Sequence, residues 1–353
     1  MTPGKMVDHA GEWLRGSGPQ SDIVISSRIR LARNVAGFPF VNRANIRQQH
    51  EILEIGKACI TNKRIADNTL WVPVDDADPL DRELLVERHL ISRPFATRKN
   101  RVPRGVAIGA DETFAIMVNE EDHLRIQVLR SGMQLDEAAA QINRIDNVLE
   151  ESLDFAYHRR FGYLAACPTN CGTGIRISVM LHLPALKMAG EIDRVKRAAR
   201  DMHLAVRGLF GEGSEAQGDL YQISNQTTLG RTEEELLHDF SHTVVPQIIS
   251  YEQQARQALV EQRGAAIDDK VWRAWGLLTH ARAIKTQEVL QLLSHLRLGL
   301  NLGRIDTVDI RTLNELFLLT QPAHLQKILG EVLSPADRRA ARARMIRQKL
   351  GAK

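Results

Sequence analysis

Two arginines separated by a single residue, Arg28 and Arg30, stand in the segment SSRIR at residues 26–30. Alternate residues of a β-strand point to the same face, so an extended segment would place both guanidinium groups side by side. Neighbouring cations repel each other unless an anion lies between them, and a polyphosphate matches their hydrogen-bonding geometry. Taken alone, the pair is more typical of an edge strand with two solvated arginines, so the phosphate interpretation depends on further motifs.

Three consecutive carboxylates, Glu120, Glu121 and Asp122, precede Arg125 in the segment MVNEEDHLR. Adjacent acids in a turn between two strands are usually just solvated. Beside a phosphate site they would gain a role, because carboxylates can hold magnesium through its water shell and one of them can act as a base.

A glycine-bearing turn, CPTNCGTGIR, runs into a strand that begins near Arg176. Small residues let backbone N–H groups approach an anion closely, although no Gly-Lys pair followed by Ser or Thr makes this a P-loop. Cys167 and Cys171 resemble half of a zinc site, but no second pair of ligands follows at metal spacing, which disfavours zinc. Beside phosphate-binding arginines a cysteine would instead be favoured as a thiolate.

A fourth segment, RGLFGEGSEAQGD, has Arg207 at the end of a strand pattern followed by a glycine-rich, acidic stretch. This composition is typical of a mobile loop that closes over a substrate, and it is equally found in plain surface connections. The argument for chemistry is the convergence of five arginines on strand ends with acids among them: Arg28, Arg30, Arg125, Arg176 and Arg207. Five cations in one cleft require a triphosphate with magnesium, and the same charges catalyse phosphoryl transfer by positioning and neutralisation.

The elements that would position these residues are of two kinds. Strands are predicted at 21–32, 105–109, 114–119, 123–129, 174–183 and 219–225, where alternation of apolar and polar residues suits a sheet with one buried face. Helices are predicted at 45–59, 135–157 and 190–202, and Thr232 with Glu235 forms a capping box that opens another. From about residue 251 only helical patterns remain. We therefore predict an α+β domain over residues 1–250 and an all-helical domain over 251–353.

Composition limits the class of protein. The net charge of +4 favours acidic partners such as nucleotides. No apolar run of 18 residues exists to span a membrane, and the first residues are not a secretory signal. Three cysteines are too few for a disulfide framework, so we expect a reducing, cytoplasmic setting. An aromatic content of 5% disfavours nucleic-acid binding, even though the C-terminal tail is very basic.

In this order and spacing, SSRIRLARN, NEEDHLR, CPTNCGTGIR and the loop after Arg207 resemble the catalytic domain of the phosphagen kinases. The resemblance extends over most of residues 20–250. It implies an antiparallel sheet flanked by helices, ATP and Mg²⁺ as cosubstrate and cofactor, and a guanidino group as the phosphoryl acceptor.

The resemblance implies a role for each matching residue. It assigns ATP binding to residues 26–30, to a histidine and to glycines and arginines of the later motifs: Ser26, Ser27, Arg28, Ile29, Arg30, His89, Arg125, Arg176, Arg207, Gly208 and Gly211. Glu120 and Asp122 match positions that hold magnesium through water. Glu121, Glu212 and Cys167 match the residues around the guanidino group, with Glu212 typical of arginine-specific members. Two carboxylates can align a guanidinium and accept its proton.

One departure bears on the substrate. Phosphagen kinases carry a helical domain and a closing loop before the first motif, whereas only 25 residues precede Ser26 here. An open acceptor site and an added C-terminal helical domain resemble the bacterial protein-arginine kinases called McsB, which mark proteins for Clp-type proteases. That resemblance implies protein substrates with accessible arginines, a Clp-type chaperone or protease and an activator protein as partners. A kinase for free arginine and a non-catalytic nucleotide- or phosphoarginine-binding adaptor remain the alternatives.

The helical region carries two further expectations. Aligned with the phosphoarginine-recognising RDxxRA motif of those kinases, this chain has Arg338 and Arg342 at the two arginine positions and Arg339 at the aspartate position. A possible phosphoarginine site therefore lacks its carboxylate. A stripe of apolar residues is either internal core or the surface of a homodimer: Trp272, Trp275, Leu277, Leu278, Leu290, Leu293 and Leu296.

Overall fold

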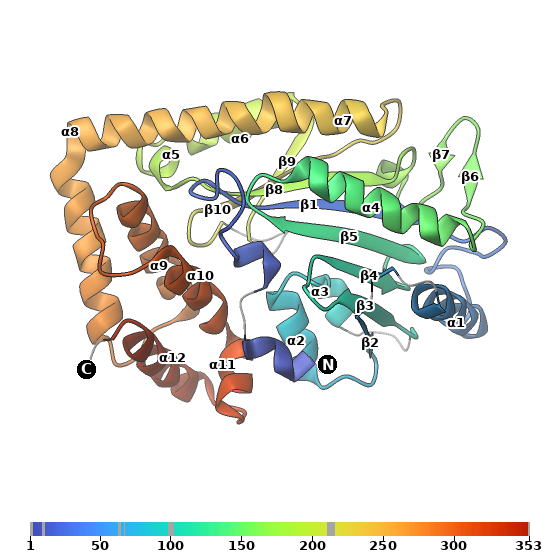
Figure 1. Ribbon diagram of the computed structural model, residues 1–353, viewed down its shortest axis with the longest axis horizontal. Coiled ribbons are helices and arrows are strands. Elements are labelled where there is room, and N and C mark those ends of the chain that lie inside the picture. Colours follow the sequence, from blue (N-terminus) through green and yellow to red (C-terminus); the bar gives the residue numbers. More distant parts are fainter. Residues whose placement is uncertain are drawn as a thin grey trace.

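The structure is a computed structural model that describes residues 3–8, 11–62, 65–66, 68–97, 102–209 and 216–351. Its centre is a sheet in the order β2-β3-β4-β5-β1-β8-β10-β9, in which neighbouring strands are antiparallel (Figure 1). The strands are β1 (Val24–Arg33), β2 (Thr69–Pro73), β3 (Gly105–Gly109), β4 (Phe114–Val118), β5 (Leu124–Ser131), β8 (Ile175–His182), β9 (Leu204–Arg207) and β10 (Leu220–Asn225). A separate hairpin consists of β6 (Tyr157–His158) and β7 (Gly162–Tyr163). The α+β prediction is confirmed.

All six predicted strands form, and β9 ends at Arg207, where the sequence showed the end of a strand pattern. The edge strand β2 and the hairpin strands β6 and β7 were not predicted. The helices of the front region are α1 (Ile46–Asn62), α2 (Pro79–Glu87), α3 (Arg93–Ala96), α4 (Leu135–Glu150), α5 (Pro184–Met188), α6 (Ile192–Asp201) and α7 (Glu233–Asp239). The capping box at Thr232 is present, with its hydroxyl accepting from Glu235 N and the Glu235 carboxylate accepting from Thr232 N. The helix predicted over 135–157 is wrong beyond residue 150, because the chain turns there into the β6–β7 hairpin.

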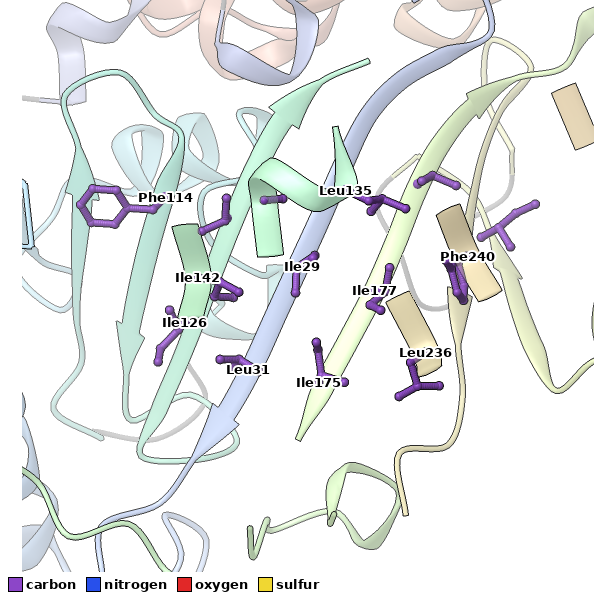
Figure 2. Packing of buried hydrophobic residues seen from close by; sticks show 14 of the residues in the cluster. Ile29, Leu31, Phe114, Ile126, Leu135, Ile142, Ile175, Ile177, Leu236 and Phe240 are labelled. Atoms are coloured by element: carbon purple, nitrogen blue, oxygen red, sulfur yellow. The ribbon is translucent and has the colours of Figure 1, made fainter. Parts of the chain in front are cut away.

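The sheet is buried on both faces, so the prediction of one buried face is wrong. Every residue of β3 and β4 is buried. On one face, α4 packs its apolar side, including Leu135 and Ile142, against Ile29 of β1 and Ile126 of β5 (Figure 2). On the other face, the residues of β1 and β8 that lie between these apolar positions surround a cavity. The alternation in sequence therefore separates a core face from a ligand face, not from bulk solvent.

The helical region comprises α8 (Val245–His280), α9 (Thr286–Asn301), α10 (Ile310–Leu319), α11 (Pro322–Leu329) and α12 (Pro335–Lys349). The position near residue 250, where we predicted a domain boundary, lies inside α8, which is kinked at Arg263. Leu278, Leu290, Leu293 and Leu296 of the predicted stripe are buried in the core of this region, and Trp275 packs against it. Trp272 and Leu277 are each 48% exposed. Among the described residues no helix is long and apolar enough to cross a membrane.

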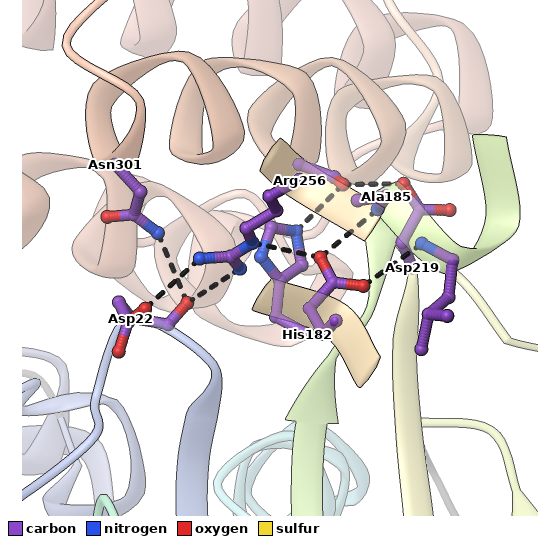
Figure 3. Close-up of polar contacts among 9 residues, drawn as sticks. Asp22, His182, Ala185, Asp219, Arg256 and Asn301 are labelled. Atoms are coloured by element: carbon purple, nitrogen blue, oxygen red, sulfur yellow. Dashed lines mark hydrogen bonds and ion pairs between the residues drawn. The ribbon is translucent and has the colours of Figure 1, made fainter. Parts of the chain in front are cut away.

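Buried polar contacts join the sheet to the helical region. Arg256 of α8 donates to Asp22 at the start of β1 and to Glu252 one helical turn earlier (Figure 3). Glu252 in turn accepts from the backbone N–H groups of Ala185 and Leu186, which begin α5. Because Glu252 is fully buried, its charge depends on these donors, and the contact fixes α8 against the sheet.

A second polar contact joins α11 to α2. The carboxylate of Glu87, at the end of α2, accepts from the backbone N–H groups of Ala323 and His324 and from the His324 ring. It thereby caps α11, whose own N-cap residue, Gln321, makes no capping bond with its side chain. Arg88 pairs bidentately with Glu112 and contacts the other ring nitrogen of His324. The end of α2, which leads directly to His89, is thus held by the C-terminal region.

Candidate active site

A cavity of about 540 Å³ lies on the ligand face of the sheet. Its walls come from β1, from the turn between β4 and β5, from β8 and β9, and from the segment that follows α2. The predicted site residues that line it are Arg28, Arg30, His89, Glu120, Glu121, Asp122, Arg125, Arg176 and Arg207. All five arginines singled out by their sequence spacing therefore surround one space.

Strand register explains why these arginines meet. Arg30 of β1 lies directly across from Arg176 of β8, and Arg28 lies across from Ser178. Between them, Ile29 points to the opposite face and is fully buried in the core under α4. Like charges directly opposed on neighbouring strands destabilise a sheet, so this placement is a cost to the fold.

Three residues of the predicted ATP stretch do not line this cavity. The Ser27 hydroxyl donates to Gly132 O and accepts from Gln134 N, and it therefore fixes the entry to α4. Ser26 lines a much smaller adjoining pocket together with Trp13 and His89. Ile29 is a core residue. The sequence motif thus contains some residues that line the cavity and others that stabilise the strand behind it.

The electrostatics of the cavity favour an anion. Burial, followed by repulsion from Arg125, Arg176 and Arg207, lowers the pKa of Arg28 to about 9. Burial and repulsion from Arg28 and the same three arginines lower the pKa of Arg30 well below its ordinary value. The Nε and Nη2 atoms of Arg30 are buried and have no hydrogen-bond partner among the described residues. Such donors match the oxygen atoms of a polyphosphate.

The acidic turn between β4 and β5 is tightly held. Asn119 adopts a left-handed backbone conformation (φ 61°), and its side chain donates to Gln49 O and Pro103 O. Asn34, just after β1, donates to the Asp122 carboxylate and accepts from His123 N. A rigid frame therefore surrounds the three carboxylates.

The three carboxylates differ in what they contact. Glu120 accepts from Ser92 Oγ at 2.5 Å and pairs with Arg125 at 2.9 Å. Burial alone would raise the pKa of Glu120, but Arg125 and these hydrogen bonds bring it below its ordinary value. For Asp122, burial outweighs the bonds from Ala166 N and Asn34 and raises the pKa. Glu121 is the exposed member of the three and lies on the cavity wall.

The glycine-bearing turn lies at one end of the cavity. Gly174 lines it with φ 69°, and a Cβ there would come within 2.8 Å of the backbone of Ala32. The Thr228 hydroxyl donates to Cys171 O and Thr169 O, so the segment after β10 holds this turn. Cys167 is partly exposed, and its thiol lies 3.0 Å from the Thr169 hydroxyl.

Neither cysteine of this turn lies in a metal site. The Cys171 thiol contacts the backbone of Ala165. Within the described parts of the chain, no group of three or more His, Cys, Asp or Glu side chains is arranged to hold a metal ion.

Several cavity residues were missed by the sequence argument. Arg93, Arg104 and Gln222 line the cavity, and Gln222 accepts from Arg28 at 2.9 Å. Ser92 caps the short helix α3 and binds Glu120. A signal was available in the run Ser92-Arg93-Pro94, which starts a helix with a cation in its first turn.

His89, which opens this segment, has a left-handed backbone conformation (φ 59°) and a ring packed edge-on against Trp13. Burial and repulsion from Arg28 and Arg93 lower its pKa to about 3, so the imidazole is neutral.

The remaining predicted residues are not among those that line the cavity in the described part of the chain. Glu212 and Gly211 are outside the described residues, and Gly208 is buried just after β9. On α12, Arg342 is buried and its guanidinium donates to Thr320 O and Ile284 O. Arg338 donates to Leu333 O. In the described structure these two arginines bind backbone carbonyls within the helical region.

Comparison with known proteins identifies the two regions. Residues 52–255 match the model of the ATP:guanido phosphotransferase C-terminal catalytic domain, and residues 264–353 match that of the protein-arginine kinase McsB C-terminal domain. The chain is 45% identical over 346 residues to a protein-arginine kinase of Halothermothrix orenii, covering 96% of each chain. It is 43% identical over 354 residues to a protein-arginine kinase of Geobacillus stearothermophilus, covering 99% of this chain and 96% of the relative.

Solved structures agree. One similar structure is the duplicated taurocyamine kinase from Schistosoma mansoni with bound components of a transition state analog. It matches with a TM-score of 0.60 and 27% sequence identity, and the match covers 70% of this chain and 34% of that chain. Lombricine kinase matches with a TM-score of 0.58 at 26% identity, over 69% of this chain and 70% of that chain. The predicted phosphagen-kinase-like fold is confirmed, and the chain is a phosphotransferase that belongs to the protein-arginine kinase family.

Proposed function

We propose that the protein transfers the γ-phosphoryl group of ATP to the guanidinium group of arginine residues in other proteins. The observation that carries this proposal is that arginines and a carboxylate line the same cavity. Five arginines line its wall, and among the described residues the buried Nε and Nη2 of Arg30 have no hydrogen-bond partner. The exposed carboxylate of Glu121 lies on the same wall. The arginines fit a polyphosphate and the carboxylate fits a cationic acceptor.

The proposed reaction uses these groups as follows. A guanidinium nitrogen of the acceptor attacks the γ-phosphorus, and the N–P bond forms as the bond to the oxygen of ADP breaks. The proton that the nitrogen loses passes to Glu121, while the arginines stabilise the charge on the phosphoryl oxygens. Glu212 is the proposed second carboxylate on the guanidinium, a role that rests on its sequence match. Cys167, on the turn beside the cavity, is proposed to lie against the acceptor.

Magnesium is the proposed cofactor, and it would neutralise charge on the β- and γ-phosphates when bound. Glu120 already contacts Ser92, Arg125 and the backbone of Glu121, and Asp122 already contacts Asn34 and Ala166. Carboxylates occupied in this way fit an ion held through its water shell, as Mg²⁺ commonly is. We therefore propose Glu120 and Asp122 as outer ligands.

The proposed setting follows from the same family. We propose cytoplasmic protein substrates with accessible arginines, marking of these substrates for Clp-type proteolysis, and control by an activator protein. A homodimer is proposed through the surface that includes Trp272 and Leu277, because two half-exposed apolar side chains near one end of α8 are typical of an interface. Phosphoarginine sensing through Arg338 and Arg342 would first require both to release their carbonyl partners.

The test is incubation of the protein with Mg-ATP and an arginine-rich unfolded protein, with phosphosites mapped under non-acidic conditions because the P–N bond is acid-labile. Phosphoarginine that disappears in Glu121→Ala would support the proposal. Turnover with free arginine alone would favour the phosphagen kinase alternative. ATP binding without turnover on either substrate would favour the adaptor.

A further inference from the structure

The β6–β7 hairpin projects from the end of the sheet where α4 ends (Figure 1). Its second strand runs directly into the turn that carries Cys167. Tyr163 N donates to Gly172 O at 2.8 Å, and Gly172 N donates to Tyr163 O at 3.2 Å. Ala166 N, three residues further along, donates to the Asp122 carboxylate. The hairpin is therefore continuous with the acceptor end of the cavity.

The base of the hairpin is rigidly held. The Tyr163 ring stacks on the buried guanidinium of Arg33 at 3.7 Å, and the Tyr163 hydroxyl donates to Glu150. Arg33 itself is fixed by a bidentate pair with Asp146 of α4. Tyr157 packs edge-on against Tyr163. Residues beyond this base are thus presented at a fixed position relative to the cavity.

The hairpin tip, which we define as residues 157–161, is unusual in composition. Its five residues, Tyr157, His158, Arg159, Arg160 and Phe161, are all exposed, with Tyr157 62% and Phe161 43% exposed. Arg159 and Arg160 have no ion pair with any described residue, and the Arg160 guanidinium lies 5.4 Å from the Phe161 ring centre. Tyrosine, phenylalanine and arginine on a rigid support are the residues enriched in protein interfaces.

We propose that the hairpin tip binds an acidic segment of the protein substrate, adjacent to the arginine that is phosphorylated. This inference rests on the proposed function and names the substrates that it favours. Two exposed arginines without an ion pair to any described residue complement carboxylates, and the exposed rings can cover the apolar parts of an extended chain. Arg160 and Ala166 are six residues apart, so the tip lies at most roughly 20 Å from the Asp122 contact at about 3.3 Å per extended residue. An acidic cluster within about six extended residues of the target arginine would fit.

The test compares three unstructured peptides that each hold one arginine. They differ only in a three-residue cluster placed six residues from that arginine, which is acidic, neutral or basic. We expect the wild type to phosphorylate the acidic peptide with a kcat/KM about three- to tenfold above the neutral one, through KM, because exposed ion pairs contribute modestly. The preference should shrink in high salt, where exposed charges are screened.

The variant Arg159→Glu/Arg160→Glu should reverse the order and favour the basic peptide, while KM for ATP and turnover of the neutral peptide stay unchanged. A structural defect would not produce such a reversal. The control Arg273→Glu/Arg282→Glu makes the same charge change at exposed positions of the helical region and should keep the wild-type order. Equal kcat/KM for all three peptides, or an acidic preference that survives the double substitution, would overturn the inference. Failure to phosphorylate any peptide or protein would instead refute the proposed function, and this inference with it.

Discussion

Replacing Arg30 by methionine should make the ligand-free protein more stable while it strongly lowers turnover. Two buried guanidinium nitrogens of Arg30 have no partner among the described residues, and Arg176 lies directly opposite on β8. A buried donor without a partner costs about 1–3 kcal/mol, and the opposed charge adds to that cost. Methionine keeps an unbranched chain but removes the charge, so we expect a gain of about 1–3 kcal/mol in the free energy of unfolding. The loss of a donor to the transferred phosphoryl group should lower kcat by about 10²–10³-fold.

Urea unfolding with and without Mg-ATP measures the stability and the effect of ATP binding on it, and steady-state assays measure kcat. In the wild type, ATP should raise the stability according to its concentration and Kd, and Arg30→Met should lose most of that increase. Arg30→Lys keeps a charge with a different geometry and serves to separate charge from hydrogen bonding. Arg273→Met, at an exposed position, controls for the change of residue type. An Arg30→Met protein that is less stable than the wild type without ligand, or that is protected equally by ATP, would refute the reasoning.

Three further outcomes are expected. Glu121→Ala should cut turnover far more than ATP affinity, because Glu121 is proposed to act on the acceptor; near-normal kcat in steady-state assays would contradict a carboxylate base. Gly174→Ala and Gly190→Ala both place alanine at a positive φ, but only at Gly174 does the new Cβ meet a backbone atom within 2.8 Å. Gly174→Ala should therefore lower the free energy of unfolding by about 1 kcal/mol more than Gly190→Ala does. Equal losses in thermal unfolding would contradict this steric explanation. Burial raises the pKa of Glu87 to about 8 in the folded state, above its unfolded value of about 4.3. Between these two pKa values the folded state binds more protons than the unfolded state, so the free energy of unfolding of the wild type should fall as pH rises from about 4 to 8. In Glu87→Gln, unfolding measured across this pH range should lack that decrease.

The sequence predicted the structure correctly where residues close together in the chain determine it. Alternation along β1 predicted that Arg28 and Arg30 share a face, and the register with β8 places Arg176 beside them. The capping box at Thr232 formed because it needs only residues within one turn. The six strands rich in β-branched residues also formed as predicted.

Failures arose where distant contacts decide the structure. The pattern over 135–157 continues as a helix in sequence, yet α4 ends at Glu150 and the chain enters a hairpin whose Tyr163 stacks on Arg33, a residue distant in sequence. Ser92 and Gln222 reach the cavity through loop geometry and strand order, which no local spacing encodes. Burial of the second sheet face was missed because it depends on which elements cover the sheet, including the segment that contains Trp13.

The shared core of the two regions limits how this protein can be recombined. Trp13, Ile25, Leu129 and Met180, from the front of the chain, pack in the same core as Leu290 and the other residues of the C-terminal helices. A chimera that joined this catalytic region to a relative's helical region at residue 250 would therefore set foreign side chains against this shared core and cut through α8. A workable exchange would also have to match the front residues of that core, including Leu129 and Met180 of the sheet, so the residues that must be exchanged together are discontinuous in sequence.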